Sequence, residues 1–316
     1  MNFKKPKFWD LQKPNTLSLI LLPFTIIIKI NNFLLNLKKK KSYFNIKKIC
    51  VGNIYIGGTG KTPSTIKLYD ILKNNNLKVS TGKKKYSKYV DEEILLGKKT
   101  KLILGTSRKK VLNSAIKENY DVVIFDDGLQ DKKISYDLQI VCFDAEKWIG
   151  NGLLIPAGPL RENIDSLKKY NCIFIKVNKK NFNNQDVEIA IKAINPNIKI
   201  FYTYYEPSNI ENLNLNNRYL IFSGIGNSEN FKKILLNNKI NVVKEIIYPD
   251  HYEYSKNDIV KLKEQAKSLS SNLLTTEKDF VKISKISNDK IDFLEVRLKI
   301  QNEEGLTKFL KDKVNE

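Results

Sequence analysis

Apolar runs alternate along this chain with segments in which apolar residues recur every three or four positions. The run Ile49–Ile56 is rich in β-branched residues, as in a strand buried on both faces of a parallel sheet. It is followed by apolar positions at helical spacing, namely Ile66, Leu68, Tyr69, Ile71 and Leu72. Further strand-like runs occur at Leu77–Ser80, Lys101–Gly105, Asp121–Gly128 and Leu138–Asp144. This alternation predicts an α/β fold with a doubly wound parallel sheet.

The same alternation continues after Glu162. Strands are expected near Cys172–Val177, Ile198–Tyr204, Tyr219–Ser223, Ile240–Ile247, Asn272–Thr276 and Phe293–Ile300, with helices between them. A chain of 316 residues is long enough for two hydrophobic cores. We therefore expect three parts: an N-terminal segment over residues 1–40, a first domain over 41–160, and a smaller α/β domain over 161–316.

The N-terminal segment is apolar and then strongly basic. Residues 17–28 read LSLILLPFTIII, and a run of lysines follows at 38–41. The apolar run is shorter than the ~20 residues that cross a bilayer, and no small-residue cleavage site follows it. It is either a helix that caps the first core or an interfacial helix. The second interpretation is favoured, with Trp9 and Phe24 as apolar anchors and the lysines facing anionic headgroups.

Composition adds a strong positive charge with few specific donors. The formal net charge is +21, but only four of the 55 basic residues are Arg. Such a chain is attracted to polyanions, whereas the bidentate base contacts that Arg provides are poorly supplied. We expect no nucleic-acid partner. The cysteines Cys50, Cys142 and Cys172 are far apart within apolar runs, which indicates buried thiols in a reducing compartment.

The strongest motif is GGTGKT, between the first strand and the first helix. Glycines let the backbone approach phosphates, the helix N-terminus favours an anion, and Lys61 supplies a cation. The Thr62 hydroxyl is positioned for Mg²⁺. The motif departs from the general pattern at its first position, where Tyr55 replaces Gly. The predicted ATP-binding residues are Tyr55, Ile56, Gly57, Gly58, Thr59, Gly60, Lys61 and Thr62.

The segment DVVIFDDG (121–128) is typical of the acidic strand that completes a phosphate-loop site. A buried strand delivers Asp126 and Asp127 to the edge of the sheet where ligands of parallel α/β folds bind. Because side chains alternate along a strand, one carboxylate is expected to meet Mg²⁺ directly and the other through water or beyond the strand. Arg108, at the start of a helix after the strand LILG, is a candidate phosphate contact.

Seven segments together resemble the tetraacyldisaccharide 4'-kinase (lipid A 4'-kinase) family and occur in its order. They are VGNIYIGGTGKTP (51–63), VDEEILL (90–96), DDGLQ (126–130), GNGLLIPAGPLRE (150–162), FSGIGN (222–227), YPDHYEYS (248–255) and LLTTEKD (273–279). The resemblance implies a lipid kinase that transfers the γ-phosphoryl group of ATP to the 4'-hydroxyl of tetraacyldisaccharide 1-phosphate, forming lipid IVA. It also implies a two-domain protein that closes over nucleotide, peripheral on the cytoplasmic face of the inner membrane.

The resemblance also assigns roles to residues of this chain. Asp91 matches the catalytic Asp of the family's GDEP segment, and His251, the only histidine here, matches the His paired with it. The Mg²⁺ and nucleotide contacts fall on Thr62, Asp126, Asp127 and Glu162. Arg161 is expected to contact phosphate or the other domain.

The chain departs from the family at three places. The Arg of the family's SRGY segment is absent where this chain reads Ser80-Thr81-Gly82-Lys83, so an anion contact is lost unless the lysines at 83–85 replace it. The insertion before VDEE is shortened to about eight residues, and Asp131 stands where the family commonly has His.

Two other functions stay open from the residues alone. A phosphate-loop ATPase or GTPase switch would use water as the nucleophile and would not need His251. The guanine signature Asn-Lys-x-Asp is, however, only approached at Val177–Asn181, where its Asp is missing. A basic nucleic-acid-binding protein would bind in a salt-sensitive way that Lys61→Ala leaves unchanged.

Overall fold

The protein divides into two compact units. The computed structural model describes residues 5–37, 44–85, 90–131, 133–178 and 184–316. The larger unit consists of Lys5–Lys85, Lys99–Tyr204 and Leu298–Glu316, and the smaller one contains Tyr205–Arg297 together with the segment that ends at Lys98. Each unit is described here by itself.

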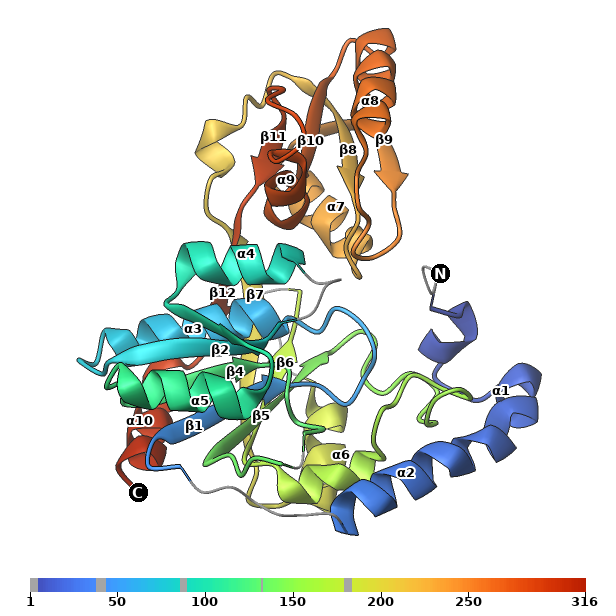
Figure 1. Cartoon of the computed structure of the whole chain (residues 1–316). Helices are drawn as coiled ribbons and strands as arrows, with labels where there is room; N and C mark the ends of the chain where they lie inside the picture. The colour runs from blue at the N-terminus through green and yellow to red at the C-terminus, as the bar shows by residue number, and fades with distance from the viewer. Residues whose placement is uncertain (1–4, 38–43, 86–89, 132, 179–183) are drawn as a thin grey trace. The chain divides into compact units, whose positions relative to one another are not determined.

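The larger unit is built on one sheet (Figure 1). Its strands are β1 (Lys47–Gly52), β2 (Val79–Lys84), β3 (Leu102–Gly105), β4 (Val122–Asp126), β5 (Leu138–Asp144), β6 (Cys172–Lys176), β7 (Lys199–Pro207) and β12 (Val296–Ile300). Their order is β12-β7-β6-β5-β1-β4-β2-β3. The pairings from β3 through to β7 are parallel. The expected α/β fold is therefore confirmed, with a large sheet that is mostly parallel.

Both faces of this sheet are covered by helices. Alternate residues point to opposite faces, so Ile49 and Val51 belong to one buried cluster and Cys50 to the other. The first cluster includes residues of α3 (Lys61–Lys73) and α10 (Glu303–Asn315). The second includes residues of α5 (Arg108–Lys117), the short helix η3 (Ile164–Lys169) and α6 (Gln185–Ile194). The sheet is doubly wound, and all three cysteines are buried within it.

The division between the units differs from the expected boundary at residues 160/161. β6 (Cys172–Lys176) pairs in parallel with β5, and β7 (Lys199–Pro207) pairs in parallel with β6, so both strands extend the first sheet. The C-terminal strand and helix also return to the larger unit. Conversely, α4 (Val90–Lys99), which lies far upstream, belongs almost entirely to the smaller unit. Strand pairing between distant segments thus sets the boundary, and local pattern does not report it.

The smaller unit has its own parallel sheet, with helices on both faces. Its strands are β8 (Arg218–Ser223), β9 (Asn241–Ile247), β10 (Asn272–Thr276) and β11 (Asp292–Leu294), in the order β11-β10-β8-β9. Residues of α8 (Lys256–Ser268) pack in one cluster and residues of α7 (Ser228–Asn237) in the other. The remaining helices are α9 (Glu277–Ile283) and the short η4 (Ile210–Asn212).

The N-terminal segment of the larger unit is helical but interrupted. It contains η1 (Lys7–Asp10), α1 (Thr16–Leu21), η2 (Leu22–Phe24) and α2 (Thr25–Leu37). The α-helical run breaks around Pro23, which lacks the N–H that a continuing helix needs. Within the described residues no helix is long and apolar enough to cross a membrane. The lysine run at 38–41 lies outside the described residues.

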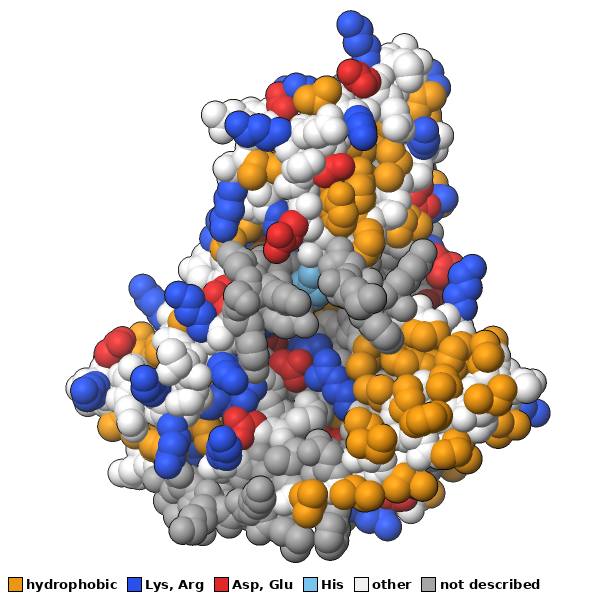
Figure 2. Space-filling model, turned by 45° about the vertical axis from the view of Figure 1, so that its right-hand side comes forward, with side chains coloured by type: hydrophobic (Ala, Val, Ile, Leu, Met, Phe, Trp, Pro, Cys, Tyr) orange, Lys and Arg blue, Asp and Glu red, His pale blue; other side chains and the backbone are white. Residues whose placement is uncertain are grey.

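Apolar side chains of this segment are exposed, and they form part of the hydrophobic surface in Figure 2. Phe24 is 55% exposed and Ile27 is 65% exposed. Trp9 was expected beside Phe24 as a surface anchor, and that prediction is wrong. Its side chain is buried, and its indole N–H donates to the Pro156 carbonyl at 3.0 Å. The exposed apolar residues of α1, η2 and α2, named below as the apolar face, are Leu17, Leu19, Ile20, Leu22, Phe24, Ile26, Ile27, Ile30 and Leu34.

Candidate active site

The glycine loop lies between β1 and α3, as the motif predicts. Gly57 has a φ of 132° and Gly60 a φ of 85°, backbone conformations that L side chains rarely adopt. Gly60 is the N-cap of α3, so the free N–H groups of the helix begin at Lys61. Glycine is therefore required by the backbone at two of its three positions, and the helix terminus provides the electrostatics of an anion site.

A buried asparagine just before the loop fixes its shape. The Asn53 side chain is fully buried, and its amide donates to the Gly57 carbonyl at 3.2 Å and to the Thr59 hydroxyl at 3.1 Å. The Thr59 N–H donates to the Gly57 carbonyl at 3.0 Å. These bonds hold the loop without a ligand, which is how a preorganised phosphate site is built.

The PAGPLRE segment supports the loop from the side. The backbone N–H of Ile56 donates to the Pro159 carbonyl at 2.9 Å, and the backbone N–H of Arg161 donates to the Ile54 carbonyl at 2.7 Å. A Cβ atom on Gly158 would lie 2.1 Å from the Asn151 side-chain oxygen, so no larger residue fits there. The motif is thus partly a structural support for the phosphate loop.

Tyr55, the unusual first residue of the loop, faces the N-terminal segment. Its hydroxyl donates to Asp10 and accepts from the Lys5 ammonium at 3.0 Å. Burial, together with the Asp10 carboxylate, raises the pKa of Tyr55 above its ordinary value. The side chain therefore stays protonated and anchors the loop, so only its backbone is free to serve nucleotide binding.

Thr62 and Asp126 meet as the two halves of the motif predict. The Thr62 hydroxyl donates to Asp126 Oδ2 at 3.0 Å, and the Lys83 ammonium lies 2.7 Å from the same oxygen. All three side chains are buried. The other oxygen of Asp126, Oδ1, is buried with no hydrogen-bond partner. A buried carboxylate oxygen without a donor is suited to a cation.

Asp127 lies beyond the end of β4 and takes a different set of partners. Its φ is 58°, which turns its side chain away from the strand. The Lys61 ammonium lies 3.8 Å from Oδ2, and Arg161 Nη1 lies 3.2 Å from it. Burial alone would raise the pKa of this carboxyl, but the charges of Lys61 and Arg161 lower it below its ordinary value. Two cations thus lie beside the loop, in a position to stabilise the negative charge of bound phosphates.

Glu162 is buried in a hydrogen-bonded group next to the loop. Its Oε1 accepts from Gln130 Nε2 at 2.9 Å and from the Tyr170 hydroxyl at 3.1 Å. Gln130 also donates to the Asn53 carbonyl at 3.0 Å, which links this group to the loop. Among the residues that the structure describes, no three His, Cys, Asp or Glu side chains form a cluster that could hold a metal ion. The assignment of Thr62, Asp126, Asp127 and Glu162 to a metal ion stays a prediction.

Arg108 stabilises the turn after β4. Its Nη1 lies 2.6 Å from Asp131 Oδ2, and its Nη2 donates to the Asp127 carbonyl. Asp131 is the residue that stands where a His is common in the family resembled. The Arg108 side chain is buried, and these two contacts of its terminal nitrogens support the turn that carries Asp127. A phosphate contact by Arg108 stays a prediction.

The smaller unit carries the second group of candidate residues. His251 follows β9 and has a φ of 59°, and its Nε2 lies 3.8 Å from Glu92 Oε1 in α4. Asp91 is the preceding residue of the same helix. Its side chain lies outside the described part of the chain, so the Asp91–His251 pair stays a prediction. The structure does bring the VDEE helix and the PDHY loop together.

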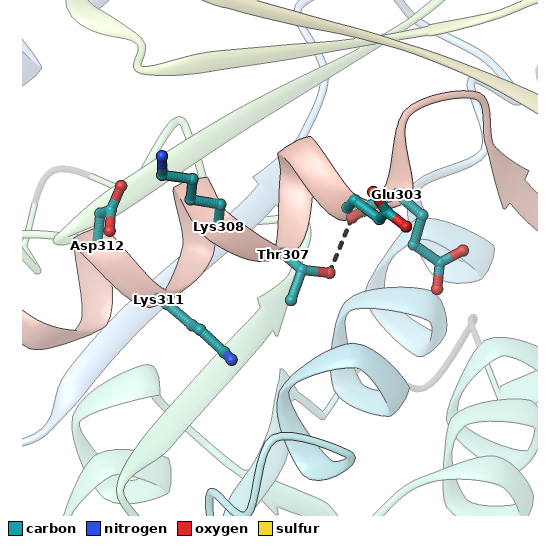
Figure 3. Close-up of a pocket in the computed structure, with 6 residues that line it drawn as sticks. Glu303, Thr307, Lys308, Lys311 and Asp312 are labelled. Carbon is teal, nitrogen blue, oxygen red and sulfur yellow. Dashed lines mark hydrogen bonds between the residues drawn. The ribbon is translucent and has the colours of Figure 1, made fainter.

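A separate hollow lies along α10 (Figure 3). It has a volume of about 620 Å³ and is lined by Glu303, Glu304, Thr307, Lys308, Lys311 and Asp312. Thr307 donates to the Glu303 carbonyl at 2.8 Å, which is an ordinary bond within a helix. The described lining includes no motif residue and mixes both signs of charge. We assign it no role in the chemistry.

Four residues of the site were not among the candidates from sequence. Lys83 was considered only as a replacement for a missing Arg, and its buried pairing with Asp126 was not foreseen. Asn53 and Gln130 both lie inside the quoted motifs VGN and DDGLQ, which was the available signal. Tyr170 lies outside every motif, and no sequence signal marks it.

Comparison with known proteins gives consistent results. A sequence model of the family described as tetraacyldisaccharide-1-P 4'-kinase (LpxK) matches residues 16–315. A tetraacyldisaccharide 4'-kinase of Pelagibacter ubique is 46% identical over 309 residues, covering 97% of each chain. One of Rickettsia bellii is 34% identical over 314 residues, covering 94% of each. The solved structure described as the "apo" form of LpxK from Aquifex aeolicus in complex with ATP has a TM-score of 0.71 at 23% identity, over 95% of this chain and 100% of that one.

Proposed function

This chain belongs to the tetraacyldisaccharide-1-P 4'-kinase family, and we propose that it transfers the γ-phosphoryl group of ATP to the 4'-hydroxyl of a tetraacyldisaccharide 1-phosphate. The product is lipid IVA, and the reaction is a step of lipid A biosynthesis. The observation that carries the proposal is the meeting of Thr62 and Asp126 at 3.0 Å, with Lys61 beside them at the start of α3. A glycine loop that joins these three groups supports phosphoryl transfer from a nucleoside triphosphate.

Nucleotide binding is assigned to the loop from Tyr55 to Thr62. The N-terminus of α3 and the glycine backbone provide N–H donors to the phosphates. The Lys61 ammonium lies 3.8 Å from Asp127 Oδ2, and Arg161 Nη1 lies 3.2 Å from the same oxygen, so both cations lie beside the loop. Their charge stabilises the negative charge that develops on the transferring group. The solved structure of LpxK from Aquifex aeolicus in complex with ATP supports this choice of nucleotide.

The residues present fit a Mg²⁺ ion bound mainly through substrate phosphates. Asp126 offers an unpartnered buried oxygen, and Thr62 offers a hydroxyl next to it. Mg²⁺ commonly takes one or two protein ligands and completes its octahedron with waters and phosphate oxygens. When bound, it would neutralise phosphate charge during transfer. Asp127 and Glu162 are assigned the outer positions, since each already accepts from protein donors.

Activation of the sugar hydroxyl is assigned to Asp91 and His251. A carboxylate can accept the proton of the attacking hydroxyl, and an imidazole next to it can orient that carboxylate. The placement of α4 beside His251, with Glu92 3.8 Å from Nε2, supports this assignment. The transfer itself requires nucleotide and acceptor to be bound in one ternary complex, with the acceptor hydroxyl in line with the bond that joins the γ-phosphoryl group to its leaving oxygen.

The acceptor is a lipid, and the apolar face supports its capture at a membrane surface. Exposed apolar side chains on α1, η2 and α2 are suited to the boundary between headgroups and acyl chains, and the net charge of +21 favours anionic lipid. We propose a peripheral position on the cytoplasmic face of the inner membrane, where this precursor lies.

A reconstituted reaction tests the proposal. The purified chain is incubated with Mg-ATP and detergent-dispersed tetraacyldisaccharide 1-phosphate, and the lipid is analysed by mass spectrometry. The expected result is a product heavier by one phosphate, formed by the wild type and not by Lys61→Ala. Lys67→Ala is the matched control, because Lys67 lies on the same helix and pairs with Glu303 at 2.7 Å. The absence of product with well-dispersed lipid would contradict the proposal.

A further inference from the structure

His251 is held by three motifs that meet in the smaller unit. Its backbone N–H donates to the Gly224 carbonyl at 3.1 Å and lies 3.0 Å from Asp250 Oδ1. Gly224 belongs to FSGIGN, and a Cβ atom there would lie 3.1 Å from Tyr252 and 3.2 Å from the Pro249 carbonyl. The PDHY loop therefore packs tightly against this glycine. The third motif, TTEKD, lies on the other side of Gly224.

Asp279 of TTEKD fixes Gly224. Its side chain is fully buried, and Oδ2 accepts from the Gly224 N–H at 2.9 Å and from the Thr276 hydroxyl at 2.8 Å. Lys282 lies 2.8 Å from Oδ1 and also donates to the Tyr252 carbonyl at 3.1 Å. The first turn of α9 is thereby locked to the loop that carries His251. The residue before Asp279 is Lys278, whose direction is set by the same turn.

Lys278 lies against the imidazole ring. Its Nζ is 3.4 Å from His251 Nδ1 and 3.6 Å from Asp250 Oδ1. An ammonium group has donors only, so a hydrogen bond between Lys278 and His251 requires a lone pair on Nδ1. In a neutral imidazole the proton then resides on the other nitrogen, Nε2.

The other side of the ring is consistent with the same tautomer. Nε2 lies 3.8 Å from Glu92 Oε1 and 3.8 Å from Asp250 Oδ1. Carboxylates are acceptors only, so an N–H at Nε2 is the form that is attracted to them. Both distances are too long for hydrogen bonds, so the interaction is only an electrostatic attraction between each carboxylate and the N–H dipole at Nε2. The cation at one nitrogen and the carboxylates near the other thus favour the same protonation pattern.

We propose that Lys278 is a positioning residue for the kinase reaction, because its ammonium group donates to His251 Nδ1 and keeps the ring proton on Nε2, on the side of the ring that faces Glu92 of α4. His251 then acts as a hydrogen-bond donor that orients a carboxylate of the VDEE helix toward the sugar hydroxyl. The inference rests on the proposed role of His251 in the reaction. It gives the Lys of TTEKD a chemical role, whereas Asp279 has a structural one.

The experiment uses the fact that the chain contains one histidine. The full-length protein is labelled with ¹⁵N-histidine, so its spectrum contains the two ring nitrogens of His251 alone. At a pH where the ring is neutral, we expect Nε2 to be protonated and Nδ1 to be unprotonated. Lys278→Met should shift the tautomer populations toward Nδ1–H, and Lys278→Arg should retain the wild-type pattern. Lys285→Met, at an exposed lysine just after α9, should leave the pattern unchanged.

Kinetics provide the second measurement. Lys278→Met should lower kcat by about 10- to 100-fold, less than the ~10²–10⁴-fold that a full acid–base group contributes, and should leave the KM for ATP unchanged. A merely structural role would not change the tautomer in a variant whose circular dichroism is native. A wild-type ring protonated on Nδ1, or a tautomer unaffected by Lys278→Met, would overturn the proposal.

The two levels of inference fail differently. The spectrum is recorded without substrate, so it does not depend on the reaction catalysed. The predicted spectrum in a protein without kinase activity would overturn the proposed function and support the contact of Lys278 with His251. Kinase activity together with the opposite tautomer would overturn the role of Lys278 alone.

Discussion

The hydroxyl of Thr62 donates to Asp126 across 3.0 Å, joining the first turn of α3 to the last residue of β4. These residues are 64 positions apart in the chain, and the parallel pairing of β1 with β4 brings them to one edge of the sheet. Asp126 keeps one buried oxygen without a partner. The contact is therefore the structural basis for assigning a cation to this edge.

Thr62→Val should selectively damage the use of Mg²⁺. Valine keeps the shape of threonine but removes the hydroxyl, so Asp126 loses one donor and the proposed ion loses one ligand. We expect kcat to fall by about 10²–10³-fold, with a higher Mg²⁺ concentration required for half-maximal rate. Steady-state kinetics over a Mg²⁺ series measures both. An unchanged Mg²⁺ requirement would argue against Thr62 as a ligand.

Lys83→Met should destabilise the larger unit. The Lys83–Asp126 pair is buried, and removing one partner leaves a buried charge uncompensated, which costs about 3–5 kcal/mol. Both tryptophans, Trp9 and Trp148, lie in the larger unit, so urea unfolding followed by tryptophan fluorescence reports on it.

Two controls accompany this substitution. Lys85→Met, at an exposed position of the same segment, should change the free energy of unfolding by no more than ~0.5 kcal/mol. Adding Asp126→Asn to Lys83→Met should restore part of the loss, because the unpaired charge is removed. Equal effects of Lys83→Met and Lys85→Met would show that the buried pair has no role in stability.

Protonation of Asp127 in acid should make the larger unit less stable. The pKa of this carboxyl is lowered in the folded state, because Lys61 and Arg161 outweigh the effect of burial. A carboxyl with a depressed folded pKa stabilises the fold above its unfolded pKa of about 3.9, and this contribution is lost as the pH falls through the folded value. Asp127→Asn should therefore lower stability at neutral pH and converge with the wild type in acid. Urea unfolding at several pH values measures this, and parallel curves would contradict it.

The apolar face should be required for membrane binding. Ile20 and Ile27 are 62% and 65% exposed, and burying such a side chain in lipid contributes about 1.5–3 kcal/mol. Ile20→Asp and Ile27→Asp should each weaken sedimentation with phosphatidylglycerol vesicles by about 10-fold or more. Ile189→Asp is the matched control, since Ile189 is 67% exposed on α6 of the same unit. Equal binding by all three variants would show that the apolar face is not the membrane contact.

Local sequence was sufficient for the features that depend on local geometry. The strand, glycine loop and helix around Lys61 follow from residue pattern and glycine conformation, and the structure has them at β1 and α3. The different environments of Asp126 and Asp127 follow from side-chain alternation at a strand end. The ion pair of Arg108 with Asp131 could not be predicted from the sequence, because only the folded chain brings these two residues together.

Features that depend on long-range pairing could not be predicted. β6 and β7 look like any other strand in sequence, and only the pairing of β6 with β5 and of β7 with β6 assigns them to the first sheet. Trp9 was misplaced because an aromatic residue in an apolar segment can face either lipid or core, and its bond to Pro156 depends on a loop 147 residues away. The buried partnership of Lys83 with Asp126 is likewise a tertiary contact between neighbouring strands.

His251→Ala tests the central claim most directly, because no other histidine can replace the lost side chain. The measurement is the rate of phosphate transfer from ATP to tetraacyldisaccharide 1-phosphate under saturating substrates, with ATP affinity measured separately. We predict a fall in kcat of about 10²–10⁴-fold with ATP affinity unchanged. Near-normal turnover by His251→Ala would contradict the account, since it would leave the PDHY loop without a part in the chemistry.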